Sequence, residues 1–502
     1  MGKPLCLVQA AIATRSGYGE HSRDLVRSLI KMDRFDVHIW GTRWGETSYI
    51  NLDTNRDREI FKRMLKTPQL PKQPDLFIHI TVPNEFLTLG KYNIGITAGI
   101  ETTHCSAPWL EGLNRMDLNI VPSKHSKEIF EKTSYSKIDE KTKQTTSTLK
   151  LEKPIEVLFE GVDTSVFKLD ENIPPAVRYE LKEISEAFCF LYVGHWLQGE
   201  MFHDRKDVGG LIKVFLETFK NVTNPPALIL KTALATNSIM DRNEIEKRIR
   251  AVKGSVQTDK PLPNVYFLHG ELTAEEMNGL YNHPKIKVHI SFTKGEGFGR
   301  PLLEASVSRK PVIAPNWSGQ IDFLNKEFSL LLPGQLMQVH PSAVWENVVV
   351  KESSWFYANY QVASNLMMNV WRDYNKFKLN ALKQAMYSEQ NFSLNKMHDR
   401  FGKILDQYLP KFAEEVPISI PSLGGLKLPK LKPIVAVEPK EAQPTTTGSI
   451  DIPLSMNMKS IDLPYQKDEH ETQVTEQPKI EEPKDENAIS REQESETLMG
   501  ND

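Results

Sequence analysis

The feature of this sequence that most limits its fold is a pattern of strand, glycine loop and helix near the N-terminus. Residues 5–11 are almost entirely apolar, as expected for a strand buried on both faces of a parallel sheet. A loop with Gly17 and Gly19 follows, and residues 20–32 repeat apolar side chains at helical spacing. The pattern predicts the beginning of an α/β domain.

The same pattern begins again in the middle of the chain. Residues 188–193 form a second apolar run, Gly194 and a loop follow, and a helix is expected over 208–219. Further strands are expected at 36–40, 76–81, 93–98, 118–122 and 155–160, and again at 227–230, 265–268 and 286–290. The alternation of strands and helices predicts two doubly wound Rossmann-like sheets facing a cleft.

These patterns divide the 502 residues into four parts. An N-terminal Rossmann-like domain is expected over 1–160 and a second over 161–340, with an exposed loop rich in lysine and threonine at 136–148. From about Pro341 to residue 411 the pattern predicts helices that pack back on the core, with Trp345, Trp355 and Trp371 among their apolar residues. Residues 412–502 are rich in Pro, Glu and Lys and predict a disordered tail. Its short apolar islands suggest docking to another protein, as the alternative to a solvated tail.

The composition excludes several classes of protein. A net charge of −3 gives no general attraction to nucleic acid. Cys6, Cys105 and Cys189 form no Cys-x-x-Cys pair, which argues against a zinc site and a disulfide framework. No apolar run approaches the ~20 residues that span a bilayer, and the N-terminus lacks a signal-peptide pattern. The expected location is therefore cytoplasmic.

The segment 291–305 carries the strongest chemical signal. Three glycines, at positions 295, 297 and 299, allow close approach of the backbone to a ligand, and the expected helix behind them favours an anion such as a pyrophosphate. Glu296 and Glu304 flank this helix start, so that one carboxylate could bind a sugar ring and the other a ribose diol. Taken singly, each is more commonly a loop or surface carboxylate, but their joint occurrence with the glycines favours a site.

Glu296 and Glu304 reproduce an E-x7-E spacing that resembles the signature of the retaining GT-B glycosyltransferases, the glycogen-synthase and mannosyltransferase-like group, or family 4-like enzymes. Four further stretches resemble the group in the same order, and together the likeness covers about residues 1–410: 161–163 with Phe167, Gly194 with Arg205 and Lys206, 268–272, and 311–319. The resemblance implies a GT-B fold and transfer of a sugar from a nucleotide-sugar to an acceptor that the sequence does not identify.

The resemblance also implies roles for individual residues. Glu296 resembles the carboxylate that binds donor-sugar hydroxyls, and Glu304 the ribose ligand. The remaining donor-binding positions implied by the likeness are Gly297, Phe298, Gly299, Gly17, Gly19 and Leu272. On the acceptor side, Glu101 follows a strand and His104 resembles a cleft histidine of the group, although a loop hydrogen-bonding role is an equal alternative.

In the group a basic pair stabilises the departing diphosphate, so neither a metal nor another cofactor is expected. Lys206 matches the lysine of that pair. The arginine is a departure, because His195 stands where the group has it; Arg205 or Lys231 could substitute. Two other classes of function remain open: a non-catalytic GT-B module that recruits partners through its tail, and an oxidoreductase using Gly17 and Gly19. The second lacks a Gly-x-Gly-x-x-Gly and leaves 291–319 unexplained.

Overall fold

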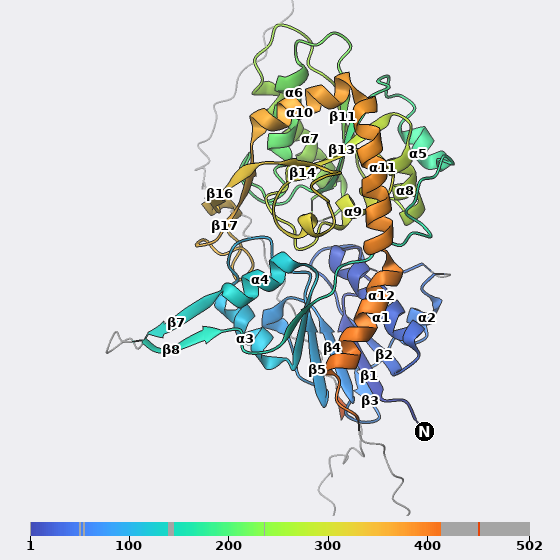
Figure 1. Ribbon diagram of the computed structural model, residues 1–502, viewed down its shortest axis with the longest axis vertical. Coiled ribbons are helices and arrows are strands. Elements are labelled where there is room, and N and C mark those ends of the chain that lie inside the picture. Colours follow the sequence, from blue (N-terminus) through green and yellow to red (C-terminus); the bar gives the residue numbers. More distant parts are fainter. Residues whose placement is uncertain are drawn as a thin grey trace, which may run out of the picture. The chain divides into compact units, whose positions relative to one another are not determined.

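Two six-stranded sheets, each with all its strands parallel, form the framework of the computed structural model (Figure 1). The structure describes residues 2–49, 52–53, 56–138, 145–234, 236–412 and 450–451. Both sheets belong to one compact unit. We call the first sheet with its helices the first lobe, and the second sheet with its helices the second lobe.

The first sheet has the strand order β2-β1-β4-β5-β6-β9. Its strands are β1 (Leu5–Ala10), β2 (Asp36–Gly41), β4 (Leu76–Ile80), β5 (Tyr92–Ile96), β6 (Leu118–Val121) and β9 (Ile155–Val157). The helices of this lobe are α1 (Gly17–Met32), α2 (Arg58–Phe61), η1 (Pro83–Glu85), α3 (Ala107–Arg115) and α4 (Lys124–Lys132). Every residue of β1 and β4 is buried, in keeping with the apolar runs.

The second sheet has the strand order β12-β11-β10-β13-β14-β15. Its strands are β10 (Cys189–His195), β11 (Ala227–Ala233), β12 (Val265–Leu268), β13 (Ile286–Ile290), β14 (Val312–Pro315) and β15 (Leu330–Leu332). The helices are α5 (Pro175–Glu180), α6 (Val208–Phe219), α7 (Ile239–Gly254), α8 (Ala274–Asn282), α9 (Arg300–Ser306) and η2 (Gly319–Asp322). This is the 3-2-1-4-5-6 order of the Rossmann fold.

In each sheet the winding direction reverses once. The reversal lies between β1 and β4 in the first sheet and between β10 and β13 in the second. Loops that leave the carboxyl ends of the two strands at such a point diverge to opposite faces and leave room for a ligand. The segment 291–299 leaves β13 at this position.

The final helices connect the two lobes. α10 (Tyr360–Arg372) packs through Met367 and Val370 into the core of the second lobe, and α11 (Tyr374–Asn391) lies against α9. The chain then crosses to the first lobe, where α12 (Leu394–Tyr408) packs beside α1 (Figure 1). Met397 and Phe401 of α12 are fully buried in the core of the first lobe.

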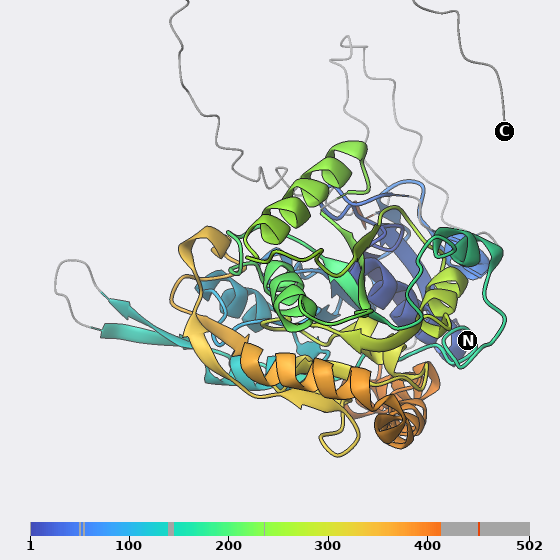
Figure 2. The same cartoon turned by 90° about the horizontal axis from the view of Figure 1, so that it is seen from above.

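The prediction of a loop at 136–148 is wrong for residues 136–138 and 145–148, which lie in strands, although 145–148 are exposed as expected; residues 139–144 lie outside the described part of the chain. The chain forms an antiparallel hairpin of β7 (Ser134–Ile138) and β8 (Thr145–Lys150), which projects from the first lobe in both views (Figures 1 and 2). Lysine and polar residues suggested a loop, but β-branched threonine favours strands. Tyr135 and Leu149 are paired across the hairpin and pack against the core of the lobe, which anchors its base.

The prediction of helices from Pro341 is wrong for the first part of that segment. Residues 341–343 form the short helix η3 (Pro341–Ala343), and β17 (Ser354–Ala358) pairs antiparallel with β16 (Gly334–Gln338). Trp355, assigned to a helical pattern from the sequence, is a buried residue of β17. Aromatic side chains suit a half-buried strand as well as a helix face, and the pairing with β16 decides between them.

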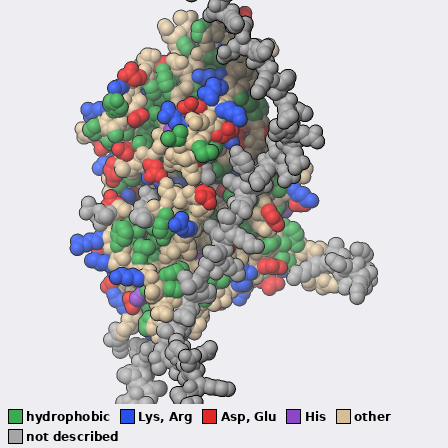
Figure 3. Space-filling view, turned by 180° about the vertical axis from the view of Figure 1, so that it is seen from behind, with side chains coloured by type: hydrophobic (Ala, Val, Ile, Leu, Met, Phe, Trp, Pro, Cys, Tyr) green, Lys and Arg blue, Asp and Glu red, His purple; other side chains and the backbone are tan. Residues whose placement is uncertain are grey.

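The predicted disordered tail lies outside the described residues, except for β18 (Ile450–Asp451), which pairs with β3 (Gln69–Leu70). Acidic and basic side chains are interspersed over the visible described surface in Figure 3. Among the residues that the structure describes, none of the helices combines the length and apolarity needed to cross a membrane.

Candidate active site

The reversal point of the second sheet brings three predicted site residues together. Arg205 and Lys206 lie in the loop after β10, and Glu296 lies in the loop after β13. The Lys206 ammonium contacts Glu296 Oε1 directly. Arg205 Nη1 lies 3.4 Å from Glu296 Oε2 and donates a 2.8 Å hydrogen bond to the carbonyl of Gly295. The lysine predicted for the diphosphate-binding pair, Lys206, and one of the two predicted substitutes for its arginine, Arg205, therefore face the Glu296 carboxylate.

These charges are strongly coupled because they are shielded from water. The side chains of Lys206 and Glu296 are only 11% and 10% exposed. Burial opposes ionisation of Glu296, but the positive charges of Lys206 and Arg205 outweigh it and hold the pKa of this carboxyl below its usual value. Burial lowers the pKa of Lys206, against the opposite effect of Glu296. The cluster favours an ionised carboxylate beside two cations.

Lys294 holds the loop that carries the basic pair. It is fully buried, and its ammonium lies 3.3 Å from the Asp207 carboxylate, also fully buried. The same ammonium donates to the carbonyls of Phe202, at 2.9 Å, and Asp204, at 2.7 Å, and the backbone N–H of Lys294 donates to the Arg205 carbonyl. Lys294 thus binds backbone carbonyls as far as Arg205 and the side chain of Asp207, which directly follows Lys206.

Lys231 lies at the carboxyl end of β11, and its ammonium donates a 2.6 Å hydrogen bond to the Gly270 carbonyl. Burial, and then the charge of Arg15, lower its pKa to about 8. Desolvation, together with the positive charges of Lys206, Arg205 and Lys231, lowers the pKa of His195 at the end of β10. These three cations therefore share one edge of the sheet with His195.

Glu304 lies one turn into α9, where Arg300 binds it. Arg300 Nε lies 3.0 Å from Glu304 Oε1, and Tyr281 Oη lies 3.4 Å from Glu304 Oε2. The other end of the Arg300 guanidinium reaches the first lobe, where Nη1 lies 2.7 Å from Asp24 Oδ2. Burial raises the pKa of Glu304 to about 7, against the opposite effect of Arg300.

The glycines of the signature loop pack against the backbone of the first lobe. A Cβ added to Gly295 would lie 1.9 Å from the Glu101 carbonyl oxygen, and one added to Gly297 would lie 1.9 Å from that of Ala98. Gly299 has φ +103° and precedes α9 as its N-cap, a conformation that favours glycine. Glycine at 295 and 297 thus serves the approach of the two lobes, whereas the sequence suggested only approach to a ligand.

The other residues predicted to bind the donor lie in different surroundings. The Phe298 side chain is buried in the core of the second lobe, with its ring centroid 5.0 Å from that of Phe323. The Leu272 carbonyl accepts a hydrogen bond from Arg15 of the first lobe. Gly19 is needed for the turn into α1, because a Cβ there would lie 2.1 Å from the Thr14 carbonyl oxygen, whereas one at Gly17 would meet nothing.

The two acceptor-side predictions differ in outcome. Glu101 lies in the loop after β5, and its carboxylate is 3.6 Å from Arg205 Nη1, so it joins the charged cluster from the first lobe. His104 is exposed, with Nδ1 3.1 Å from its neighbour Thr103 Oγ1. The structure therefore brings Glu101 to the site and leaves His104 in a loop contact.

Three charged residues of the site were missed from the sequence. Arg15 crosses to the second lobe, where it is paired with Glu271 at 3.3 Å. Lys294 and Arg300 both lie within the signature segment. The signal for Arg300 was available in part, since it precedes Glu304 by four positions on a helix. The other partners of these residues, Glu271 of Arg15, Asp207 of Lys294 and Asp24 of Arg300, lie far away in the sequence.

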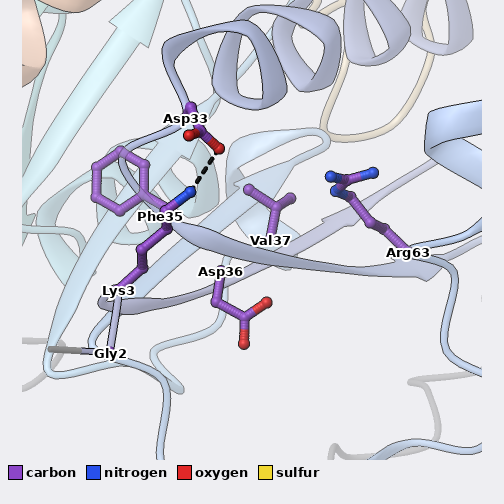
Figure 4. A pocket seen from close by; sticks show the side chains of 7 residues that line it. All are labelled: Gly2, Lys3, Asp33, Phe35, Asp36, Val37 and Arg63. Carbon is purple, nitrogen blue, oxygen red and sulfur yellow. Dashed lines mark hydrogen bonds and ion pairs between the residues drawn. The ribbon is translucent and has the colours of Figure 1, made fainter.

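A shallow hollow lies elsewhere on the first lobe. It is lined by Gly2, Lys3, Asp33, Phe35, Asp36, Val37 and Arg63 (Figure 4). None of these residues belongs to the charged cluster, and Lys3 is paired with Asp33 across the hollow. Within the described ranges, no group of three or more His, Cys, Asp or Glu side chains is placed to hold a metal ion.

Comparison with known proteins supports the fold. No family model and no curated protein sequence matches the chain. Among solved structures, it is similar to a sucrose-phosphate synthase from Thermosynechococcus elongatus, with 13% identity, 81% of this chain and 98% of that chain covered, and a TM-score of 0.51. It is also similar to a glycosyltransferase from Rickettsia africae, with 14% identity, 82% of this chain and 100% of that chain covered, and a TM-score of 0.52.

A third similar structure is that of HepE from Anabaena, solved in complex with UDP-glucose. The identity is 13%, the match covers 80% of this chain and 100% of the HepE chain, and the TM-score is 0.51. At these identities the likeness concerns the fold alone. It confirms the predicted fold class: GT-B, with two Rossmann-like doubly wound domains facing a cleft and a C-terminal helical segment.

Proposed function

We propose that this chain is a retaining, metal-independent glycosyltransferase that moves a sugar from a nucleotide-sugar donor to an acceptor hydroxyl. The observation that carries the proposal is the contact of Lys206 and Arg205 with Glu296 at the reversal point of the second sheet. The fold adds support, since similar structures include a glycosyltransferase and a protein in complex with UDP-glucose.

The roles follow from the chemistry of the side chains. Glu296 accepts hydrogen bonds from hydroxyls of the donor sugar near the reacting carbon, and Glu304 accepts them from the ribose. Lys206 and Arg205 stabilise the negative charge that grows on the diphosphate as it departs. Lys231, at the same edge of the sheet, adds a third cation. With three cations present, a metal ion is not required to balance the leaving-group charge.

In the reaction, the bond between the anomeric carbon and the diphosphate oxygen breaks, and a bond from the acceptor oxygen to that carbon forms on the same face. The acceptor proton passes to the departing diphosphate oxygen. Glu101, which faces Arg205 from the first lobe, lies on the acceptor side. The proposal includes retention of configuration and the front-face route because Glu296 and Glu304 have the E-x7-E spacing.

The location proposed for this activity is the cytoplasm. Cys6, Cys105 and Cys189 are free and buried thiols, which fits a reducing compartment.

The test is a donor screen with the full chain. UDP-, GDP-, ADP- and TDP-sugars are incubated with the protein and a crude acceptor extract, with and without EDTA, and released nucleoside diphosphate is measured. We expect release from one donor, unaffected by EDTA and lost in Glu296→Gln. NMR of the product then gives the anomeric configuration, and inversion would contradict the retaining assignment. Nucleotide binding without release from any donor would instead identify a non-catalytic module.

A further inference from the structure

Within α9, the helix that follows the loop 291–299, Arg300 is the only residue whose side chain forms ion pairs with both lobes in the described part of the chain. It is the first residue of α9, and its side chain is 14% exposed. Nη1 lies 2.7 Å from Asp24 Oδ2 on α1 of the first lobe, while Nε lies 3.0 Å from Glu304 Oε1 on its own helix. The guanidinium therefore lies between a carboxylate of each lobe.

Asp24 is buried and paired with another residue of its own lobe. Its side chain is 1% exposed, and its second oxygen, Oδ1, lies 3.0 Å from Arg27 Nη1. Arg27 in turn contacts Asp57, which is also buried. Because Asp24 is fixed by this network, the position of Arg300 depends on the position of the first lobe. An arginine that served only its own helix would need no such partner.

On the second lobe, Glu304 uses only part of its hydrogen-bonding capacity. Arg300 Nε occupies one position at Oε1, and Tyr281 Oη, at 3.4 Å, approaches Oε2. An ionised carboxylate accepts about four hydrogen bonds. Each oxygen thus keeps capacity for one more donor, and two neighbouring hydroxyls supply two donors.

The surrounding charge makes Arg300 important for the ionised form. Glu20 and Asp24 of α1, together with Glu160 after β9, add negative charge near Glu304 and Arg300. Burial and these carboxylates favour the protonated form of Glu304, and Arg300 favours the charged one. A protonated carboxyl has fewer acceptor sites for hydroxyl groups.

We propose that Arg300 is a positioning residue that couples the contact between the lobes to recognition of the nucleotide ribose. Asp24 of the first lobe holds the guanidinium, and the guanidinium orients the Glu304 carboxylate toward the two vicinal ribose hydroxyls. The inference rests on the proposed function, because it takes Glu304 to be the ribose ligand.

The simpler explanation is an ordinary helical pair between positions 300 and 304. Such a pair stabilises its helix only slightly and does not depend on another lobe. The two explanations differ in what Asp24 does. Among the described contacts Asp24 makes no hydrogen bond or ion pair with Glu304, and its own charge favours the protonated form of Glu304, so Asp24 can support the carboxylate only by holding Arg300.

The experiment compares nucleotides that differ in one hydroxyl. Binding of UDP, GDP and ADP and of their 2′-deoxy counterparts is measured by calorimetry for the natural protein and for Arg300→Met, Arg300→Lys, Asp24→Asn and the double variant. In the natural protein, we expect the 2′-hydroxyl of the preferred nucleotide to improve affinity about 10-fold, as for a hydrogen bond to a charged group. Arg300→Met should reduce this ratio to near one.

The remaining variants test the coupling. Asp24→Asn should also reduce the ratio, and the double variant should be no worse than Arg300→Met alone, because both act through one guanidinium. Arg300→Lys should restore part of the ratio. As a control, Arg34→Met removes an arginine whose pair with Asp406 is at the surface, with side chains 41% and 65% exposed, and should leave the ratio unchanged.

The outcomes separate the two proposals. An unchanged ratio in Arg300→Met, with Glu304→Gln abolishing it, would overturn the role of Arg300 and leave the proposed function intact. Equal weakening of the ribo and deoxy forms in Arg300→Met would overturn it also, since a merely structural change acts on both. Failure of the natural protein to bind any of the nucleotides would overturn the proposed function and this inference together.

Discussion

The Lys206 ammonium is in direct contact with the Glu296 carboxylate, although 90 positions separate the two residues in the sequence. The pair joins the loop after β10 to the loop after β13, and Arg205 adds a second cation to the same carboxylate. A donor diphosphate and its sugar would therefore meet residues whose charges already compensate each other, which limits the cost of burying them.

Replacement of Lys206 tests its role as a leaving-group cation. In Lys206→Met we expect kcat to fall about 10²-fold or more, because charge stabilisation at a buried site acts mainly in the transition state, while KM for the donor changes less. Steady-state release of nucleoside diphosphate measures both. Lys247→Met is the matched control, since Lys247 is 76% exposed on α7 and should give unchanged kinetics. A larger effect on KM than on kcat would contradict the assignment.

Gly297→Ala tests the contact between the lobes. The added Cβ would lie 1.9 Å from the Ala98 carbonyl oxygen, so the loop or the first lobe has to move. We expect kcat/KM to fall at least about 10-fold, because displacement of a positioned group by about 1 Å is costly. Gly254→Ala is the control, since its Cβ would meet nothing within 4 Å. Equal activity in the two variants, measured by donor turnover, would contradict this expectation.

The buried Glu160 gives a pH dependence of stability. Desolvation by burial is the main cause that raises the pKa of its carboxyl from about 4.5 to about 7. The folded state therefore binds more protons than the unfolded state between these values, so this contribution to stability falls as pH rises from about 4.5 through about 7 and is then lost. Between pH 6 and pH 8 we expect Glu160 to reduce the free energy of unfolding by about 1 kcal/mol.

Glu160→Gln removes this group while keeping its size. Denaturant unfolding at pH 6 and pH 8 should show a smaller loss of stability in the variant than in the natural protein. Titrating groups remote from Glu160 cancel in the comparison, because both proteins contain them. A pH dependence identical in the two proteins would show that Glu160 has an ordinary pKa.

The Lys294–Asp207 pair gives a prediction on stability. Both side chains are fully buried, so Lys294→Met leaves an uncompensated buried carboxylate and should cost about 3–5 kcal/mol in urea unfolding. The double variant with Asp207→Asn should recover part of the loss. For comparison, Lys132→Met removes an exposed pair with Glu128 and should cost less than about 1 kcal/mol. A similar cost for both lysines would mean that the buried pair is solvated.

Much of the fold follows from local patterns in the sequence. The run at 188–193 became β10, the helix predicted over 208–219 matches α6 (Val208–Phe219), and the strand at 286–290 matches β13 (Ile286–Ile290). Burial on both faces makes a strand apolar throughout, so these elements are visible without a structure. The strands β7, β8 and β17 were not predicted, because each is short and is stabilised by pairing with another strand.

The sequence by itself determined that the chain contains two strand–glycine–helix domains and which loop carries Glu296 and Glu304, because periodicity and glycine spacing are local properties. Only the tertiary structure decided which distant charges meet: Asp24 at Arg300, 276 positions away, Glu101 rather than His104 at Arg205, and Lys294 beneath the basic pair. These contacts depend on how the two lobes pack, and packing at long range leaves no period in the sequence.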